Sequence, residues 1–230
     1  MKTIGLIGGM SWESTVGYYQ AINRGIKQQL GGLHSAKIIL NSVDFDPIEK
    51  LQHCGDWGGT ADILCQAAQS VEAAGADCLL ICTNTMHKVA PQVSHAVSIP
   101  LLHIADATGS ALQQQGVQRV GLLGTGFTME QDFYKGRLVE QFGLEVLVPG
   151  AEDRQIVHRV IYQELCLGQV DADSRAHYLR IIDTLKAQGA EAVILGCTEI
   201  GLLLTQHDTE MPLFDTTAIH AAAAVDFALS

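Results

Sequence analysis

A cysteine follows an unbroken apolar stretch late in the chain. Residues 192–195 are all apolar, and Gly196, Cys197, Thr198 and Glu199 come directly after them. An apolar run bounded by small and polar residues is typical of a buried strand in a parallel sheet. Ligands of open α/β sheets bind at the carboxyl ends of the strands, so we expect the Cys197 thiol to face a ligand. Its position makes this thiol a candidate reactive group.

The same pattern occurs once earlier in the chain. Gly75 aligns with Gly189, 114 residues later, and in this register Thr83 takes the place of Cys197. Two further pairs of segments match in the same order, namely 4–8 with 120–124 and 100–103 with 212–215. Three matched blocks indicate a duplication, which predicts two similar halves. We expect both strand ends to face one cleft, with Thr83 and Cys197 on opposite sides of the ligand.

Strand and helix signals alternate along the whole chain. This order predicts an α/β fold of two pseudo-symmetric lobes, each a parallel sheet flanked by helices. Residues 1–104 with 211–230 are expected to form the first lobe and residues 105–210 the second. The expected strands are 4–7, 37–43, 78–82, 99–104, 119–123, 144–149, 192–195 and 211–215, and the clearest helices are 60–74, 156–167, 173–189 and 217–229.

Composition limits the partners and the compartment. The net charge is −11 and no cluster of Lys and Arg stands out, so neither nucleic acid nor an anionic membrane is an expected partner. No run reaches the roughly 18 apolar residues of a membrane span, and no secretory signal is recognisable at the start, which favours a cytoplasmic protein. The six cysteines are therefore expected as reduced thiols, and without Cys-x-x-Cys spacing no metal site is expected.

Polar residues after the other strands are candidates for substrate binding. Gly8 and Gly9 lead to Met10, and the matching strand of the second half leads to Thr125. Backbone N–H groups at such strand-to-helix turns attract carboxylates, so Met10 and Thr125 are expected to line a small-anion site. The G-x-G-x-x-G pattern of dinucleotide sites is absent.

Four more candidates follow from the same placement. Asn84 and Thr85 come after Thr83, and Thr198 follows Cys197, so all three are expected at strand ends. Gln52 lies in the polar segment 44–53, which leaves the second strand on the ligand side and should overhang the site. A solvated loop remains an equally open interpretation of that segment.

These motifs resemble the cofactor-independent aspartate/glutamate racemases of the aspartate, glutamate and hydantoin racemase superfamily. The resemblance covers essentially the whole chain and is carried by the motifs at 7–10, 84–87 and 196–199. It implies two α/β lobes, each contributing one cysteine, with an acidic amino acid between them. One thiolate removes the α-proton and the other thiol protonates the opposite face, without pyridoxal phosphate or metal. It also implies a homodimer.

The chain departs from the family at the first cysteine. Thr83 stands directly before Asn84, where the family has its cysteine, and Cys82 comes one residue earlier. A shift of one residue turns a strand side chain to the opposite face, so Thr83 is expected in the site and Cys82 away from it. Cys197 is then the main base, and Thr83 donates or relays a proton.

Other functions remain open at this stage. Arylmalonate decarboxylases of the same superfamily resemble one-thiol members, although aromatic residues for an aryl pocket make up only 6% of this chain. Maleate isomerase and hydantoin racemase activities are also compatible. A protein that binds amino acids without catalysis is a third interpretation, permitted by Thr83 and disfavoured by the intact motif at 197–199. No arginine at a strand end selects an acidic side chain, so broader amino-acid use is open too.

Overall fold

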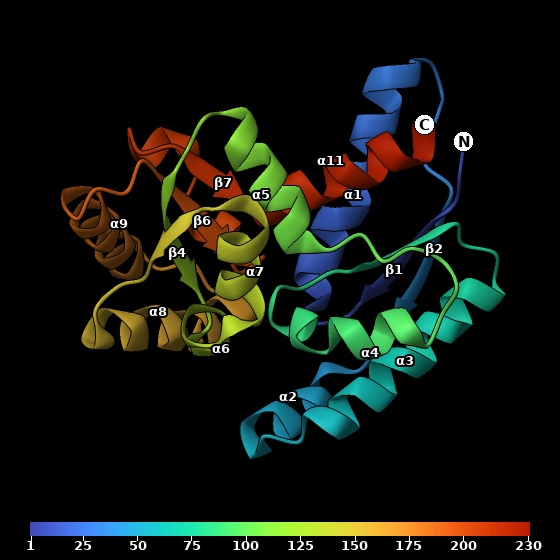
Figure 1. The fold of residues 1–230 in the computed structure, drawn as a ribbon, viewed down its shortest axis with the longest axis horizontal. Helices are drawn as coiled ribbons and strands as arrows, with labels where there is room; N and C mark the ends of the chain where they lie inside the picture. The colour runs from blue at the N-terminus through green and yellow to red at the C-terminus, as the bar shows by residue number, and fades with distance from the viewer. The chain divides into compact units, whose positions relative to one another are not determined.

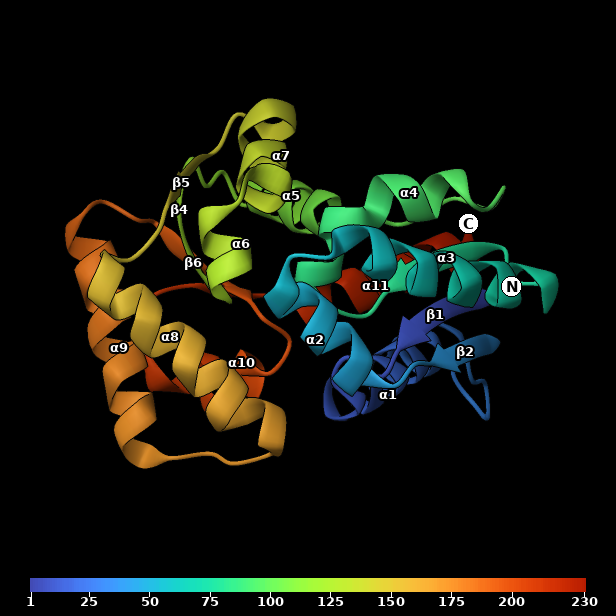
Figure 2. The same cartoon turned by 90° about the horizontal axis from the view of Figure 1, so that it is seen from below.

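The computed structural model describes Met1–Ser230 and divides the chain into two compact units. The first unit consists of Met1–Ile104 and His220–Ser230, and the second consists of Ala105–Ile219. Each unit contains one parallel sheet flanked by helices (Figures 1 and 2). The predicted α/β fold with two parallel sheets is confirmed.

The first unit is built on a sheet of three strands in the order β2-β1-β3. Its elements are β1 (Ile4–Gly8), α1 (Trp12–Leu30), β2 (Ile38–Ser42), α2 (Phe45–Cys54), α3 (Trp57–Ala73), β3 (Cys78–Ile81), a 3₁₀ helix η1 (Thr85–Val89) and α4 (Ala90–His95). Helix α3 packs on one face of the sheet, and α1 packs on the other. The polar segment at 44–53 forms helix α2 rather than a loop.

The side chains of β3 alternate between the two faces of this sheet. Leu79 and Ile81 join the cluster under α3, whereas Cys78, Leu80 and Cys82 join the cluster under α1. Both clusters are buried from solvent. The alternation carries through the end of the strand, so Cys82 points into the core on the α1 side.

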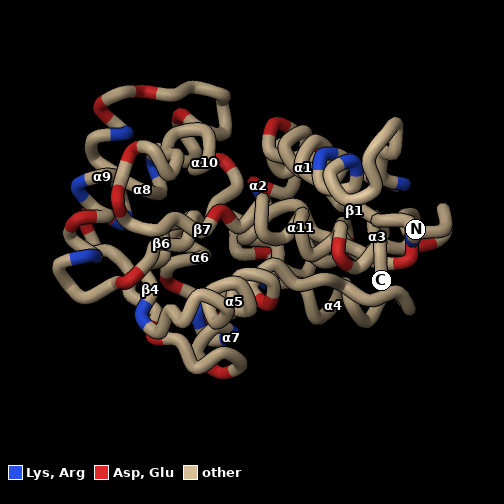
Figure 3. Tube along the Cα trace, turned by 90° about the horizontal axis from the view of Figure 1, so that it is seen from above, with Lys and Arg blue, Asp and Glu red and all other residues tan.

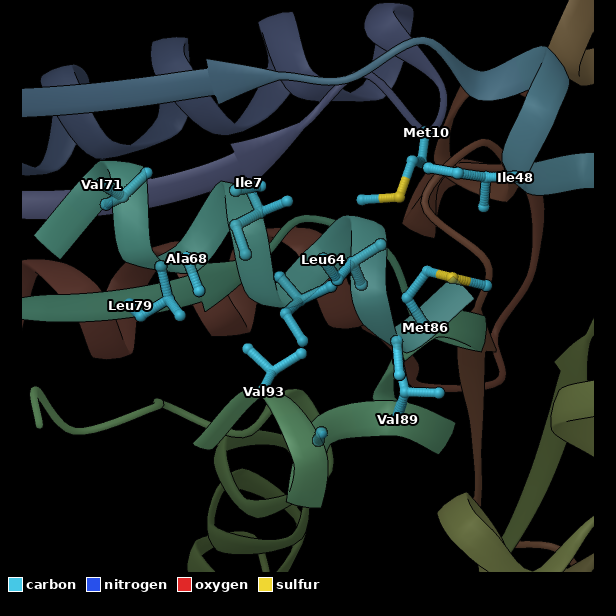
Figure 4. Close-up of a cluster of buried hydrophobic side chains, with 14 of the residues drawn as sticks. Ile7, Met10, Ile48, Leu64, Ala68, Val71, Leu79, Met86, Val89 and Val93 are labelled. Atoms are coloured by element: carbon cyan, nitrogen blue, oxygen red, sulfur yellow. The ribbon is translucent and has the colours of Figure 1, made fainter. Parts of the chain in front are cut away.

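The core under α3 reaches the carboxyl end of the sheet. Figure 4 shows Met10, Ile48 and Met86 at one end of this cluster, with Val71 and Leu79 at the other. The first three follow or overhang the strand ends, where a ligand of a parallel sheet would lie. Apolar packing therefore holds the loops that surround the strand ends of the first unit.

The second unit repeats this arrangement with one more strand, in the order β5-β4-β6-β7. Its elements are β4 (Arg119–Gly124), α6 (Gly126–Glu130), α7 (Asp132–Phe142), β5 (Glu145–Leu147), α8 (Ala151–Gln163), η2 (Leu165–Leu167), α9 (Ala172–Ala187), β6 (Ala192–Gly196), α10 (Ile200–Leu203), η3 (Gln206–Asp208) and β7 (Leu213–Asp215). Two helices carry the chain across the unit boundary, α5 (Ile104–Gln114) and α11 (Thr216–Leu229).

The strand registers of the two sheets correspond. Ile7 of β1 pairs with Ile81 of β3, and in the second unit Leu123 of β4 pairs with Leu195 of β6. One step further, Gly124 pairs with Gly196, which leaves Cys197 as the first residue beyond the strand. The predicted alignment of the halves therefore agrees with the pairing inside each sheet.

Two sequence expectations are wrong in detail. The strand expected at 99–104 is reduced to a single bridge between Leu79 and Leu101, because Pro100 has no N–H to donate and α5 already begins at Ile104. The residues expected to rejoin the first lobe from 211 do so only from His220, because β7 pairs with β6 in the second unit.

Charged residues are spread along both units. Figure 3 shows Lys and Arg as separate short segments interspersed with Asp and Glu. Helix α11 carries one charged residue, Asp226, along its whole length. None of the helices is both long and apolar enough to cross a bilayer.

Candidate active site

Cys197 is the first residue beyond β6 and is 8% exposed. Gly196 before it lies so close to β4 that an added Cβ would come within 2.7 Å of Leu122 Cδ1 and 2.8 Å of the Leu123 carbonyl oxygen. Only glycine fits at this position, and the close packing of the two strands fixes where the next residue emerges. The backbone thus sets the position of the thiol.

The thiol of Cys197 is hydrogen-bonded to a buried carboxylate. Its Sγ lies 2.9 Å from Oε2 of Glu199, and the Thr198 hydroxyl donates to the same oxygen at 2.8 Å. Glu199 is 2% exposed. Burial, followed by the negative charge of Glu199, raises the pKa of Cys197 well above its ordinary value. The resting side chain is therefore a neutral thiol that donates its proton to Glu199.

Two more titratable side chains interact electrostatically with this thiol. Cys166 of η2 contributes to the raised pKa of Cys197, and Cys197 in turn acts on the buried phenol of Tyr178. The Tyr178 hydroxyl donates to the Val157 carbonyl oxygen at 3.0 Å, and burial raises the pKa of the Tyr178 phenol well above its ordinary value. The backbone N–H of Glu199 acts in the opposite direction and favours the thiolate, but its effect on the pKa of Cys197 is smaller than that of burial and the Glu199 charge.

Thr83 lies two residues beyond the end of β3, and Cys82 stands between them. Thr83 is partly exposed, whereas Cys82 is fully buried in the core, where burial raises the pKa of its thiol. The carbonyl oxygen of Thr83 accepts a hydrogen bond from Nδ1 of His87 at 2.8 Å. The structure thus exposes the hydroxyl-bearing residue and buries the thiol beside it.

The other predicted binding residues of the first unit are buried. Met10 is 3% exposed within the core under α3, and Asn84 and Thr85 are 2% and 5% exposed beyond β3. Gln52, near the end of α2, is 3% exposed, and its Nε2 lies 3.6 Å from Sδ of Met86. Gln52 and Met10 are therefore joined to one end of the apolar core, as Figure 4 shows for Met10 and Met86.

The strand-to-helix turns use some of their amides internally. The Gly9 N–H donates to Oγ1 of Thr15 at 2.8 Å, and Oγ1 of Thr125 accepts from the Thr128 N–H at 3.3 Å. Gly9 has a φ of +95°, and an added Cβ would lie 2.2 Å from the Val43 carbonyl oxygen, so the turn requires glycine. The expected anion site therefore cannot use the Gly9 amide in this arrangement.

The structure brings the predicted residues together in two groups, one in each unit. Thr83, Asn84 and Thr85 are consecutive beyond β3, whereas Thr125, Cys197 and Thr198 lie beyond the paired ends of β4 and β6. The sequence places His87 near the predicted site, but it assigns a function to neither His87 nor Glu199. The sequence does contain a signal for Glu199, because an acidic residue two positions after a cysteine at a strand end lies within reach of the thiol.

The structure offers no ready metal site and no disulfide. No group of three or more His, Cys, Asp or Glu side chains lies close enough together to hold a metal ion. All six cysteines are free thiols.

Comparison with known proteins identifies the family. The model of the Asp/Glu/hydantoin racemase family matches residues 7–224, which include both Thr83 and Cys197. The chain belongs to this family. Curated relatives of the chain include proteins named as racemases, and racemases are isomerases.

Solved structures of the family share the fold over the full chain. A Yersinia pestis protein solved as a candidate Asp/Glu racemase is 58% identical, with a TM-score of 0.93 and complete coverage of both chains. An aspartate racemase homologue from Pyrococcus horikoshii OT3 is 36% identical, with a TM-score of 0.84 and the same coverage. The broad specificity amino-acid racemase RacX of Bacillus subtilis is 24% identical over 69% of this chain and 67% of its own length.

Proposed function

We propose that the protein is a cofactor-independent amino-acid racemase of acidic amino acids, with Cys197 as its main base and Thr83 in place of a second cysteine. The hydrogen bond between the Cys197 thiol and Glu199 is the observation that supports this most strongly. A general base must lie within hydrogen-bond reach of the proton that it removes, and this pair satisfies that condition for activating the thiol.

Glu199 supplies the means to form the thiolate. Since the resting thiol is neutral, its proton must leave before Cys197 can act as a base. In the proposed step the Glu199 carboxylate takes the proton from Sγ, and the thiolate then takes the α-proton of the substrate. The Cα–H bond breaks and an S–H bond forms, leaving a carbanion next to the substrate carboxylate. The proton on Glu199 returns to solvent.

Thr83 acts on the opposite face of the substrate Cα. A hydroxyl is too weak an acid to form a stable alkoxide at neutral pH. Thr83 must therefore donate its proton and receive a new one from water in a single concerted step. The hydroxyl proton goes to Cα while Thr83 Oγ1 accepts a proton from water. The hydroxide left behind is neutralised by the proton that Glu199 releases to solvent, so atoms and charges balance. Thr83 is partly exposed, which allows the water to approach.

The substrate range follows from the family and from the residues at the strand ends. Aspartate and glutamate are the proposed substrates because this family and the Pyrococcus horikoshii homologue are named for them. None of Met10, Gln52, Asn84, Thr85, Thr125 and Thr198, the proposed binding residues, carries a charge. Uncharged contacts allow amino acids other than aspartate and glutamate to serve as substrates. The relative RacX is named a broad specificity amino-acid racemase. Gln52 is the proposed contact with the substrate side chain.

Chiral chromatography of purified protein tests this proposal. L- and D-aspartate, L- and D-glutamate and an arylmalonate are incubated separately without pyridoxal phosphate and with a chelator. Formation of the opposite enantiomer from aspartate or glutamate, and its loss by about 100-fold or more in Cys197→Ser, is the expected result. The exposed Cys54→Ser variant is the matched control and retains activity. Carbon dioxide release from the malonate without racemisation would reject the proposal in favour of a decarboxylase.

A further inference from the structure

The imidazole of His87 is held by hydrogen bonds at both ring nitrogens. Nδ1 lies 2.8 Å from the Thr83 carbonyl oxygen, and Nε2 lies 3.2 Å from the Ile104 backbone nitrogen. A carbonyl oxygen only accepts and a backbone N–H only donates, so Nδ1 carries the proton and Nε2 accepts. The ring is 1% exposed and neutral in this arrangement.

Two further histidines surround this ring. The ring centroid of His103 lies 4.5 Å from that of His87, and the centroid of His220 lies 5.9 Å away. Nε2 of His220 lies 2.8 Å from the Leu102 carbonyl oxygen, which only accepts, so Nε2 carries a proton, and Nδ1 lies 2.9 Å from the Tyr18 hydroxyl. Burial, and then electrostatic interaction with the His103 and His220 rings, lower the pKa of His87 well below its ordinary value.

The cluster coincides with the ends of the first unit. Ile104, which donates to His87, is the last residue before the chain enters the second unit. His220 is the first residue after the chain returns. The cluster of buried rings therefore includes His220 at one crossing of the unit boundary and contacts Ile104 at the other. It also contacts the backbone of Thr83.

We infer that His87 is a positioning residue, whose neutral ring fixes the Thr83 backbone through Nδ1–H and the departing chain at Ile104 through Nε2. This inference rests on the proposed function of Thr83. The Thr83 backbone determines the position of the hydroxyl that reprotonates the substrate. Through His87, the position of this hydroxyl depends on the start of α5. A displacement of about 1 Å at a reacting group lowers turnover by about 100-fold, so loss of this anchor is costly.

Two isosteric variants separate the two ends of the ring. In His87→Asn the new side-chain amide nitrogen takes the place of Nδ1 and still donates to Thr83, whereas His87→Gln reaches the Nε2 position and keeps only the Ile104 contact. We expect kcat within about threefold of wild type for His87→Asn and at least about tenfold lower for His87→Gln, with KM nearly unchanged in both. The matched controls are His95→Asn and His95→Gln, because exposed His95 makes the same bond to Pro91, four residues earlier, at 2.6 Å.

A double-mutant cycle shows whether His87 acts through Thr83. In the Thr83→Val background, His87→Gln should cause no further loss of kcat. Thermal unfolding of each variant measures the loss of stability. Equal loss of kcat in His87→Asn and His87→Gln, in step with loss of stability, would overturn the inference.

Two further outcomes distinguish the inference from the proposed function. Full activity of Thr83→Val rejects the proposed role of Thr83 and with it any catalytic role of His87. Reduced activity of Thr83→Val, with an equal effect of His87→Gln in both backgrounds, rejects the positioning role alone. Nitrogen-15 NMR of the ring gives a readout independent of activity: a proton on Nδ1 supports the inference, and a proton on Nε2 contradicts it.

Discussion

The Sγ atom of Cys197 lies 2.9 Å from a carboxylate oxygen of Glu199, two residues further along the chain. A thiol beside a buried carboxylate is less acidic than a free thiol. In the resting protein Cys197 therefore keeps its proton and is not a thiolate. The carboxylate that raises the pKa of Cys197 is also the group that can take its proton. Substitution of Glu199 separates these two effects.

Replacing Glu199 by Gln should change thiol reactivity and catalysis in opposite directions. Removing the negative charge lowers the pKa of Cys197. At a pH below the pKa, each unit by which the pKa falls increases the thiolate fraction about tenfold. Alkylation of Cys197 by iodoacetamide at pH 8, followed by peptide mass spectrometry, should therefore become faster. Racemisation should become about 100-fold slower or more, because the proton acceptor is gone. A slower alkylation in Glu199→Gln would show that the carboxylate activates the thiol in the resting protein.

Thr83 and Cys82 should differ sharply in their effect on turnover. Thr83→Val removes the hydroxyl and should lower kcat by about 100-fold, whereas Thr83→Ser keeps it and should stay within about threefold. Cys82→Ala, the matched control one residue earlier, alters only a buried core position and should leave kcat unchanged. Chiral assays of the three variants measure this. Loss of turnover in Cys82→Ala at unchanged stability would assign the second catalytic group to Cys82.

Gly196→Ala should destabilise the second unit. The added Cβ meets the Leu123 carbonyl oxygen at 2.8 Å, so the strands must separate, at a cost of about 1–3 kcal/mol in unfolding free energy. Gly17→Ala is the matched control, since its Cβ would meet nothing within 4 Å and alanine stabilises a helix interior by about 0.5–1 kcal/mol. Urea unfolding of both variants gives the two free energies. An unchanged stability of Gly196→Ala would contradict the close packing of β4 and β6.

The neutral state of His87 should make stability depend on pH below about 6.5. The folded protein lowers the pKa of His87, so between the two pKa values the unfolded chain binds the extra proton. The unfolding free energy should fall by up to about 1.4 kcal/mol per pH unit from this one group as the pH decreases below about 6.5. His103 and His220 face the ring in both proteins, so the difference between the two slopes is assigned to His87. Urea unfolding at pH 5 to 7 should give a steeper slope for wild type than for His87→Asn, and parallel slopes would refute a neutral His87.

The sequence alone predicts the strand ends but not the hydrogen bonds formed there. Apolar runs of four or five residues and a repeat at a fixed spacing identify β1, β3, β4 and β6, because buried parallel strands tolerate few polar side chains. Alternation along β3 places Cys82 in the core under α1, as the side-chain period of a strand predicts. The bond between Cys197 and Glu199 lies in a turn, where no periodicity fixes side-chain direction.

Long-range contacts explain the remaining differences. Helix α2 is polar on most of its surface, and its helical form depends on capping by Asp44 and on packing of Ile48 against the core. The assignment of β7 to the second unit depends on which sheet edge is open to it, which local sequence does not encode. The roles of His87 and Ile104 likewise depend on a contact between residues far apart in the chain.

Deuterium wash-in at the substrate Cα tests the central claim most directly. Each enantiomer of aspartate or glutamate is incubated separately in D₂O with the protein, and loss of the Cα–H signal is followed by proton NMR at early times. The equilibrium constant between enantiomers is one, so kcat/KM must be equal in the two directions, and any asymmetry of the two faces appears in exchange. We predict exchange at least about tenfold faster for the enantiomer whose Cα–H faces Cys197 than for the other enantiomer. This rapid exchange should be retained in Thr83→Val and abolished in Cys197→Ser. Equal exchange from both enantiomers, or exchange that survives in Cys197→Ser, would contradict a single thiol base.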